Sequence, residues 1–296
     1  NGNEGGWNTK LDKLFYEYDP QQRHVIHPWA DFDDLDTHHY PTYLTGVGRF
    51  TNGYKVFMPT EFMHTNSDQG GGAGLEDFWD NWTRHPLFAG GFIWAFVDES
   101  IERRDMDDKL DCHFDMGNDG LVGPYREKEG SYYAVKHIWS PVQIRDLFIT
   151  PSFKGDFYIT NKYLFSDLSE VKMVYRLKRI QNPAEGAGSS VSAKGEIKVP
   201  VLAPNTTGIM HLDLPEGFFD NDLLELEAFA ADGSSICTWT WPIRYANDYF
   251  KRHNPFRPAS GKAGIKEEGG SVKLCAAGLS AGFNPENGNL ESLELN

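Results

Sequence analysis

Two glutamates, Glu4 and Glu61, are the residues whose setting could support chemistry. Glu4 lies in NGNEGGWN (1–8), where a glycine pair permits backbone angles closed to other residues, and alone it reads as a solvated carboxylate in a turn. Glu61 lies at the C-terminal end of the apolar run KVFMPTEF (55–62), which is typical of a buried strand. Aromatic residues make up 14% of the chain and include 8 Trp, and such rings stack on sugars as well as filling cores. Two carboxylates on an aromatic platform favour glycosidic-bond cleavage.

The first 140 residues alternate short apolar runs with helical patterns. The spacing predicts a helix over 8–18, ended by Asp19-Pro20, because the residue before proline avoids the α region. Strands are predicted at 24–28, 37–41, 55–62 and 90–98, with a helix on Leu75, Phe78, Trp79 and Trp82. Strand, helix, strand in this rhythm predicts parallel pairing with right-handed crossovers. In parallel α/β barrels the C-terminal strand ends carry the chemistry, so Glu61 and Glu4 could face each other across a barrel mouth.

Beyond residue 140 the apolar pattern repeats every two residues. Turn residues separate the runs at the spacing of a β-sandwich, with predicted strands at 157–165, 171–177, 195–200, 208–214, 223–230 and 237–243. Residues 181–194 read as a polar loop. From about residue 246 the chain reads as a linker, and 271–296 reads as the first strands of a further β domain.

Composition excludes several classes. A net charge of −15 and a pI near 5.0 argue against a nucleic-acid or anionic-membrane surface, which needs clustered Lys and Arg. Three scattered cysteines suit neither a disulfide framework nor a zinc site, and leave the redox compartment open. Apolar runs stay below the roughly 18 residues that a membrane helix needs. His24, His27, His38 and His39 match no standard zinc spacing, so we expect strand and loop histidines rather than a metal site.

Several stretches together resemble glycoside hydrolase family 2, in its β-galactosidase branch. Asn3-Glu4 is similar to the Asn-Glu pair of the wider clan of (β/α)8 glycosidases, and YDPQQRHV (18–25) resembles the segment that follows it there. Residues 59–101 resemble the nucleophile region, in which Glu-aromatic-X-His precedes a glycine turn, a Trp-bearing helix and Gly-Gly-Phe-X-Trp-X-X-Val-Asp. NDGLVGPYREKEGSYYAVKHIWSPVQI (118–144) continues the match into the next domain.

The resemblance implies an α/β plus all-β fold, cut from within a longer enzyme. Residues 1–140 would be strands five to eight of a (β/α)8 TIM barrel, the C-terminal half of the catalytic domain. Residues 141–245 would form an immunoglobulin-like β-sandwich, and 246–296 a linker with the first strands of a C-terminal β domain. Natural chain ends, oligomeric state and compartment, with periplasmic and extracellular space among the options, stay open.

The resemblance also implies roles. Glu61 would be the nucleophile of a retaining mechanism and Glu4 the general acid and then base, with carboxyl groups about 5–5.5 Å apart. Three residues would bind the sugar: Tyr40 by holding the nucleophile, His64 at hydroxyl groups, and Trp94 under the apolar face. Asp119 falls where an Asn often lies near a monovalent cation and the 6-hydroxyl, although a turn aspartate before glycine is the plain alternative.

Departures from the family leave the substrate open. Thr65-Asn66-Ser67-Asp68 replaces a Met-Gly-Asn turn, and the upstream Glu and His of the family's magnesium site are not in this sequence. We therefore expect no complete Mg²⁺ site or other cofactor here, although the parent enzyme of such a family uses Mg²⁺ and Na⁺. The expected substrate is a β-galactoside oligosaccharide or polysaccharide, with β-mannosides, β-glucuronides, a non-catalytic carbohydrate-binding scaffold and an inactive relative as alternatives. Open barrel edges predict that the isolated chain is inactive and self-associates.

Overall fold

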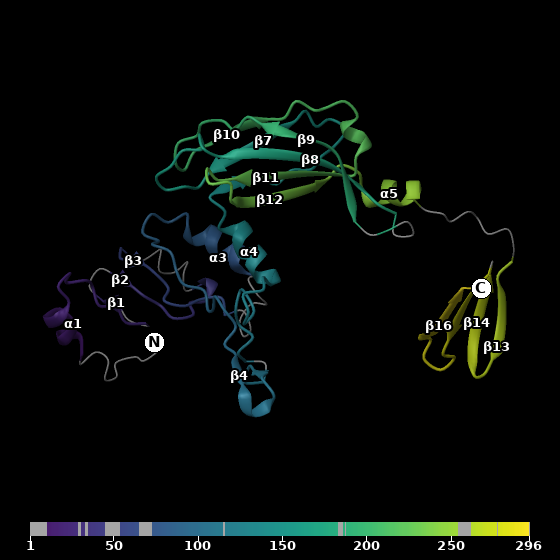
Figure 1. Ribbon diagram of the computed structural model, residues 1–296, viewed down its shortest axis with the longest axis horizontal. Helices are drawn as coiled ribbons and strands as arrows, with labels where there is room; N and C mark the ends of the chain where they lie inside the picture. Colours follow the sequence, from purple (N-terminus) through teal and green to yellow (C-terminus); the bar gives the residue numbers. More distant parts are fainter. Residues whose placement is uncertain are drawn as a thin grey trace.

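The computed structural model describes residues 11–28, 31–32, 35–44, 54–64, 73–114, 116–182, 186, 188–253, 262–276 and 278–295. Within them the chain is mostly β-strand with few helices, arranged as an N-terminal α/β region, a two-sheet sandwich and a C-terminal sheet (Figure 1). Glu4 lies outside the described residues.

The N-terminal region combines short strands with short helices. Its elements are α1 (Asp12–Tyr18), β1 (Asp31–Phe32), β2 (Leu35–Asp36), β3 (Val56–Phe57), α3 (Leu75–Trp82), β4 (Ile101–Arg103), the 3₁₀ helix η2 (Arg104–Met106), β5 (Lys109–Asp111) and α4 (Gly130–Ile138). β1 and β2 are antiparallel, β2 and β3 are parallel, and β4 and β5 form a separate antiparallel hairpin.

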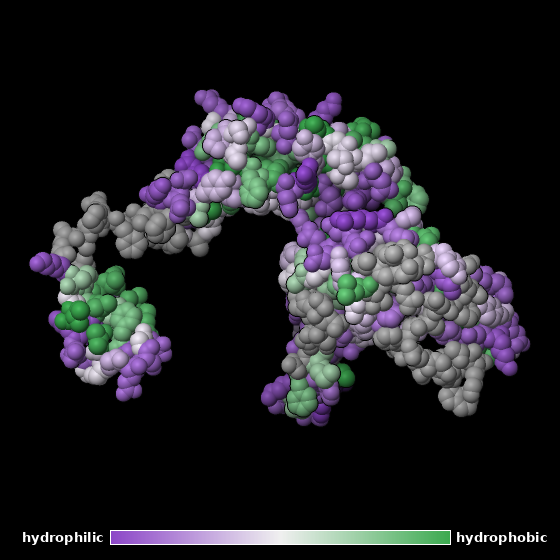
Figure 2. Space-filling model, turned by 180° about the vertical axis from the view of Figure 1, so that it is seen from behind, coloured by the Kyte–Doolittle hydropathy of each residue, from purple (hydrophilic) through white to green (hydrophobic). Residues whose placement is uncertain are grey.

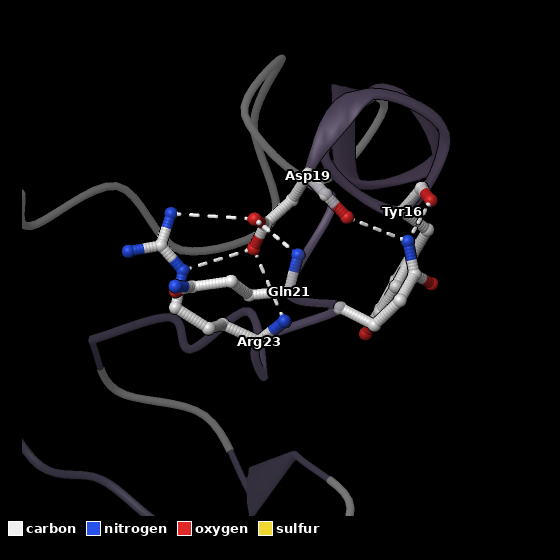
Figure 3. Close-up of polar contacts among 5 residues, drawn as sticks. Tyr16, Asp19, Gln21 and Arg23 are labelled. Atoms are coloured by element: carbon white, nitrogen blue, oxygen red, sulfur yellow. Dashed lines mark hydrogen bonds and ion pairs between the residues drawn. The ribbon is translucent and has the colours of Figure 1, made fainter.

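Helix α1 ends where the sequence predicts. Asp19 leaves the helix with an extended backbone before Pro20, and its carboxylate accepts bonds from the Gln21 N–H and from the backbone and guanidinium of Arg23 (Figure 3). The guanidinium bond is the main reason why the pKa of Asp19 lies below its ordinary value. The predicted apolar stripe of this helix is exposed in the structure, with Tyr18 74% accessible, so amphipathic spacing alone did not predict burial.

Parallel pairing links three consecutive segments of this region. Beyond the ladder of β2 and β3, His39 bridges Glu61, and Phe57 and Phe62 bridge Phe88 and Ile93 of the segment after α3. The predicted strands at 37–41 and 90–98 are therefore present as bridges rather than as full strands, and 24–27 has no strand structure. The strand-to-strand order along the chain matches the predicted parallel arrangement.

Aromatic packing holds α3 against these segments. Trp82 is fully buried, and its ring centroid lies 5.1–5.5 Å from those of Phe57, Phe62, Phe78 and Phe88. The predicted helical spacing is confirmed here, because Leu75, Phe78 and Trp82 are the buried face of α3. Phe62, the residue after Glu61, is thereby anchored in the core.

The sandwich has its own core between two antiparallel sheets. Its elements are β6 (Val142–Ile144), β7 (Asp156–Asn161), β8 (Lys172–Ile180), β9 (Ser189–Ile197), β10 (Thr207–His211), the 3₁₀ helix η3 (Phe218–Asp220), β11 (Leu223–Phe229) and β12 (Ser235–Pro242). The sheets are ordered β10-β7-β6 and β12-β11-β8-β9. Alternate residues such as Phe157, Leu226, Trp239 and Trp241 fill the interior, as the period of two predicts.

One sequence prediction for the C-terminal half of the chain was wrong. The polar stretch 181–194 is not one loop, because β9 begins at Ser189 and pairs with β8 as an edge strand. Its N-terminal residues are exposed on both faces, so their polar composition hid the strand. Helix α5 (Ala246–His253) opens the stretch after residue 246, and most of the expected linker KRHNPFRPASGK (251–262) lies outside the described residues.

A four-stranded antiparallel sheet follows, as β13 (Gly264–Glu268), β14 (Ser271–Ala276), β15 (Leu279–Phe283) and β16 (Leu290–Leu295). The register aligns Ile265, Leu274, Ala281 and Leu293 across one face, which is apolar and exposed (Figure 2). In the described part of the chain, no helix has the length and apolar character to cross a bilayer.

Candidate active site

The candidate site lies where the paired segments end. The bridge between His39 and Glu61 places their side chains on the same face, with His39 Nε2 3.4 Å from Glu61 Oε2. The backbone N–H of Tyr40 donates to the Glu61 carbonyl oxygen at 2.8 Å, and the N–H of Thr60 donates to that of His38 at 2.9 Å. Main-chain bonds therefore fix Glu61 on both sides of its Cα.

The pairing contains an irregularity that aims Glu61. Leu35 pairs with Val56, and His39 pairs with Glu61. The segment from Val56 to Glu61 is therefore one residue longer than the segment from Leu35 to His39 with which it pairs. An extra residue of this kind is a β-bulge, which changes the direction of the side chains after it and is common beside active sites.

Two residues flanking the carboxylate have left-handed backbones. Tyr40 has φ 55° and Met63 has φ 57°, although neither is glycine. Bulky residues in this region are strained by about 1–3 kcal/mol and persist only where the surroundings hold them. Met63 is held in the core, and the Tyr40 ring lies edge-on to His39, with centroids 4.8 Å apart. Such strain concentrates at functional sites.

A second group of residues centres on Asp119. Its carboxylate accepts a hydrogen bond from the Trp94 indole N–H at 2.8 Å, and His64 Nε2 lies 3.4 Å from the same oxygen. A main-chain bond joins the same two segments, because the Ala95 N–H donates to the Asp119 carbonyl oxygen. Asp119 is buried, whereas Trp94 and His64 are half-buried, so the aspartate orients two side chains that solvent still reaches.

A glycine without room for a side chain positions Asp119. A Cβ on Gly120 would lie 2.3 Å from the Asp98 backbone nitrogen, while the Gly120 N–H donates to the Asp98 carboxylate at 2.8 Å. Nearby, burial, assisted by the carboxylates of Asp98 and Glu127, raises the pKa of Glu129. This side of the site therefore depends on close backbone packing and carries concentrated negative charge.

The two groups meet through Tyr40 and His64, whose ring centroids are 6.0 Å apart. Five of the six residues that the sequence singled out are thus brought together, namely Tyr40, Glu61, His64, Trp94 and Asp119; Glu4 lies outside the described residues. The sequence reasoning missed His39 as a site residue, because it considered this histidine only as a possible metal ligand and rejected that role. The available signal was its place directly before Tyr40.

The Mg²⁺ and Na⁺ that the family resemblance implies have no cluster of candidate ligands among the described residues. Among the described residues, no three His, Cys, Asp or Glu side chains converge in a way that could hold an ion. We therefore derive no step through a metal at this site.

Three curated proteins, all named β-galactosidase, are similar in sequence. The protein of Oenococcus oeni is 24% identical over 52% of this chain, that of Streptococcus thermophilus 29% over 44%, and that of Actinobacillus pleuropneumoniae 26% over 62%. The chain spans 16%, 13% and 19% of their respective lengths. No family model matches the chain.

Among solved structures, the exo-chitosanase CsxA of Amycolatopsis orientalis is matched over 57% of this chain and 21% of that one. The sequence identity is 13% and the TM-score 0.25, a likeness on which we build no argument. The sequence similarities support a distant relationship to glycosidases.

Proposed function

We propose that this chain forms part of the catalytic unit of a retaining exo-β-glycosidase that hydrolyses terminal β-linked galactose. The observation that carries the proposal is the convergence of a carboxylate, an indole, two imidazoles and a buried aspartate at the end of parallel-paired segments. The names of the distant relatives supply the substrate class.

Glu61 is the nucleophile in this proposal. One carboxylate oxygen attacks the anomeric carbon, and the glycosidic oxygen leaves with a proton from the general acid, which we assign to Glu4 from the family resemblance. Water, deprotonated by the same Glu4, then attacks the anomeric carbon and releases Glu61 as a carboxylate. The role suits Glu61, because main-chain bonds on the paired segment hold its backbone and so fix where its carboxylate is presented.

Trp94, His64 and Asp119 form the sugar-binding side in this proposal. The half-buried Trp94 ring offers a flat apolar face, on which the C–H face of a pyranose stacks. The His64 ring nitrogens can donate to or accept from sugar hydroxyls, and Asp119 orients both side chains. Loss of that orientation would weaken binding of substrate and transition state together.

The fold around the site is also part of this proposal. We infer that the parallel-paired segments of residues 1–140 are strands five to eight of a (β/α)8 barrel, with 141–245 as the sandwich and 246–296 as linker and further β domain. The order of parallel bridges along the chain supports this inference. The short span relative to the similar proteins supports a catalytic unit completed by additional sequence.

The test is intact-mass labelling of the full-length protein that carries this chain with 2-deoxy-2-fluoro-β-galactosyl fluoride, followed by peptide mapping. We expect one added sugar on the peptide that contains Glu61. The matched controls separate the two roles: Glu61→Gln takes up no label, whereas Glu4→Gln is still labelled, because fluoride leaves without a proton. Labelling only by the 2-fluoro-mannoside or glucuronide would keep the mechanism and replace the substrate. No label from any of the three sugars would overturn the proposal.

A further inference from the structure

His39 is a histidine beside the candidate nucleophile that the proposed mechanism does not yet use. It is 9% exposed, and its Nε2 lies 3.4 Å from Glu61 Oε2. The contact follows from backbone register, because His39 and Glu61 are bridged residues of neighbouring parallel segments. A chance approach of two flexible side chains would have no such origin.

The surroundings of His39 fix its ring. Its Nδ1 lies 3.4 Å from the Thr60 hydroxyl, and its ring meets Tyr40 edge-on at an interplanar angle of 81°. The Thr60 hydroxyl is also 3.4 Å from the His38 carbonyl oxygen, so its one proton can go to either acceptor. An ionised carboxylate only accepts hydrogen bonds, so the neighbouring Glu61 favours the tautomer with the proton on Nε2. Neighbours on two sides therefore hold the imidazole in the plane that lets it donate to the carboxylate.

We propose that His39 is a positioning residue for Glu61, donating its Nε2–H to one carboxylate oxygen so that the other is presented to the anomeric carbon. This inference rests on the proposed function for its kinetic meaning, but the hydrogen bond itself does not. His39 touches the reacting carboxylate and acts through it, with no bond to the sugar.

The consequence differs between the two halves of the reaction. When Glu61 attacks, its charge is lost as the ester bond forms, so the hydrogen bond from His39 weakens. When water attacks the anomeric carbon, the bond from that carbon to Glu61 breaks and its electron pair returns to the carboxylate. The hydrogen bond from His39 then strengthens as negative charge returns to Glu61, so His39 assists the second step more than the first.

One arm of the test uses the 296-residue chain and does not depend on activity. The side-chain ¹⁵N signals of His39 are compared in the wild type and in Glu61→Gln by NMR, with those of His38 as the internal control. His38 precedes His39 on the same segment, and alternation directs its side chain to the other face. We expect the His39 signals to shift and the His38 signals to stay. Unchanged His39 signals would overturn the inference.

The kinetic arm uses the full-length protein and the 2-fluoro-galactosyl enzyme, whose formation and hydrolysis are timed separately. For His39→Ala we expect hydrolysis to slow about 10- to 150-fold, the range for a lost bond to a charged group, and formation to slow less. His39→Gln, which keeps an N–H donor, restores part of the loss, and His38→Ala changes both rates less than about threefold. Equal slowing of both steps in His39→Ala, or none, would contradict the assigned role.

The two arms separate the failures. If the wild-type protein takes up no label although the His39 signals respond to Glu61→Gln, the proposed function is wrong and the hydrogen bond stands. If labelling occurs on Glu61 but His39→Ala leaves the ratio of the two rates unchanged, the function stands and the role of His39 is refuted.

Discussion

The bond from Trp94 to Asp119 gives a quantitative prediction. Replacing Asp119 by Ala leaves the indole N–H without its carboxylate acceptor, 2.8 Å away in a site where the aspartate is 3% exposed. A hydrogen bond to a charged group contributes about 1.5–3 kcal/mol. We therefore expect the Trp94 indole N–H to exchange with solvent about 10- to 150-fold faster in Asp119→Ala.

The assay is hydrogen exchange of the indole N–H by NMR, with the signal assigned from Trp94→Phe. Asp119→Asn keeps an acceptor oxygen in place and should retain most of the protection. His64→Ala removes the contact between His64 and Asp119 and should leave the Trp94 exchange unchanged. Equal exchange rates in Asp119→Ala and the wild type would refute the view that this carboxylate holds the indole.

Three further changes have defined outcomes. Gly120→Ala brings a Cβ to 2.3 Å from the Asp98 backbone nitrogen, so the backbone must shift. We expect the free energy of unfolding, measured in urea, to fall by about 1–3 kcal/mol and the Trp94 indole signal to move. An unchanged indole signal would contradict the packing argument. Leu226→Ala opens a cavity in the sandwich core and should cost about 2–5 kcal/mol by the same method, whereas a loss below about 1 kcal/mol would show that the core collapses around it. Burial disfavours ionised Glu225, but bonds from Lys178 and a neighbouring arginine outweigh burial and lower its pKa; its stabilisation is therefore present above pH 4.5 and lost as pH falls through the folded value. Glu225→Gln should flatten the fall in urea midpoint between about pH 5 and pH 3, and an equally steep fall would exclude this carboxyl as a source.

The sequence predicted those elements whose local pattern also decides their packing. Helix α3 buries the residues that its spacing indicates, and β11 and β12 bury alternate side chains as the period of two requires. Polar edge strand β9 was hidden, because a strand exposed on both faces has no apolar period. In α1 the spacing was right about the helix and wrong about burial, since periodicity does not specify what covers the apolar face.

The candidate site was predictable in part. Motifs that resemble a known family pointed to Glu61, His64 and Trp94, and the structure places these residues in two neighbouring groups joined through Tyr40 and His64. The contact of His39 with Glu61 could not be derived, because it depends on the register between two segments and on a bulge that no local pattern encodes. The chemical roles of these residues are proposals, which the labelling experiment tests directly.

The bulge between Val56 and Glu61 also limits how the length of this segment can change. Deleting one residue from it would make the pairing with β2 regular, and by that measure would improve the sheet. The same deletion would leave Glu61 opposite His39, but it would remove the local bend that changes the direction of the side chains after the bulge, including Glu61. A shift of two residues would keep the face but move the carboxylate about 6–7 Å along the strand, out of reach of His39. Insertions and deletions that preserve the site are therefore confined to the connections between paired segments, and the irregular strand is the one that must keep its length.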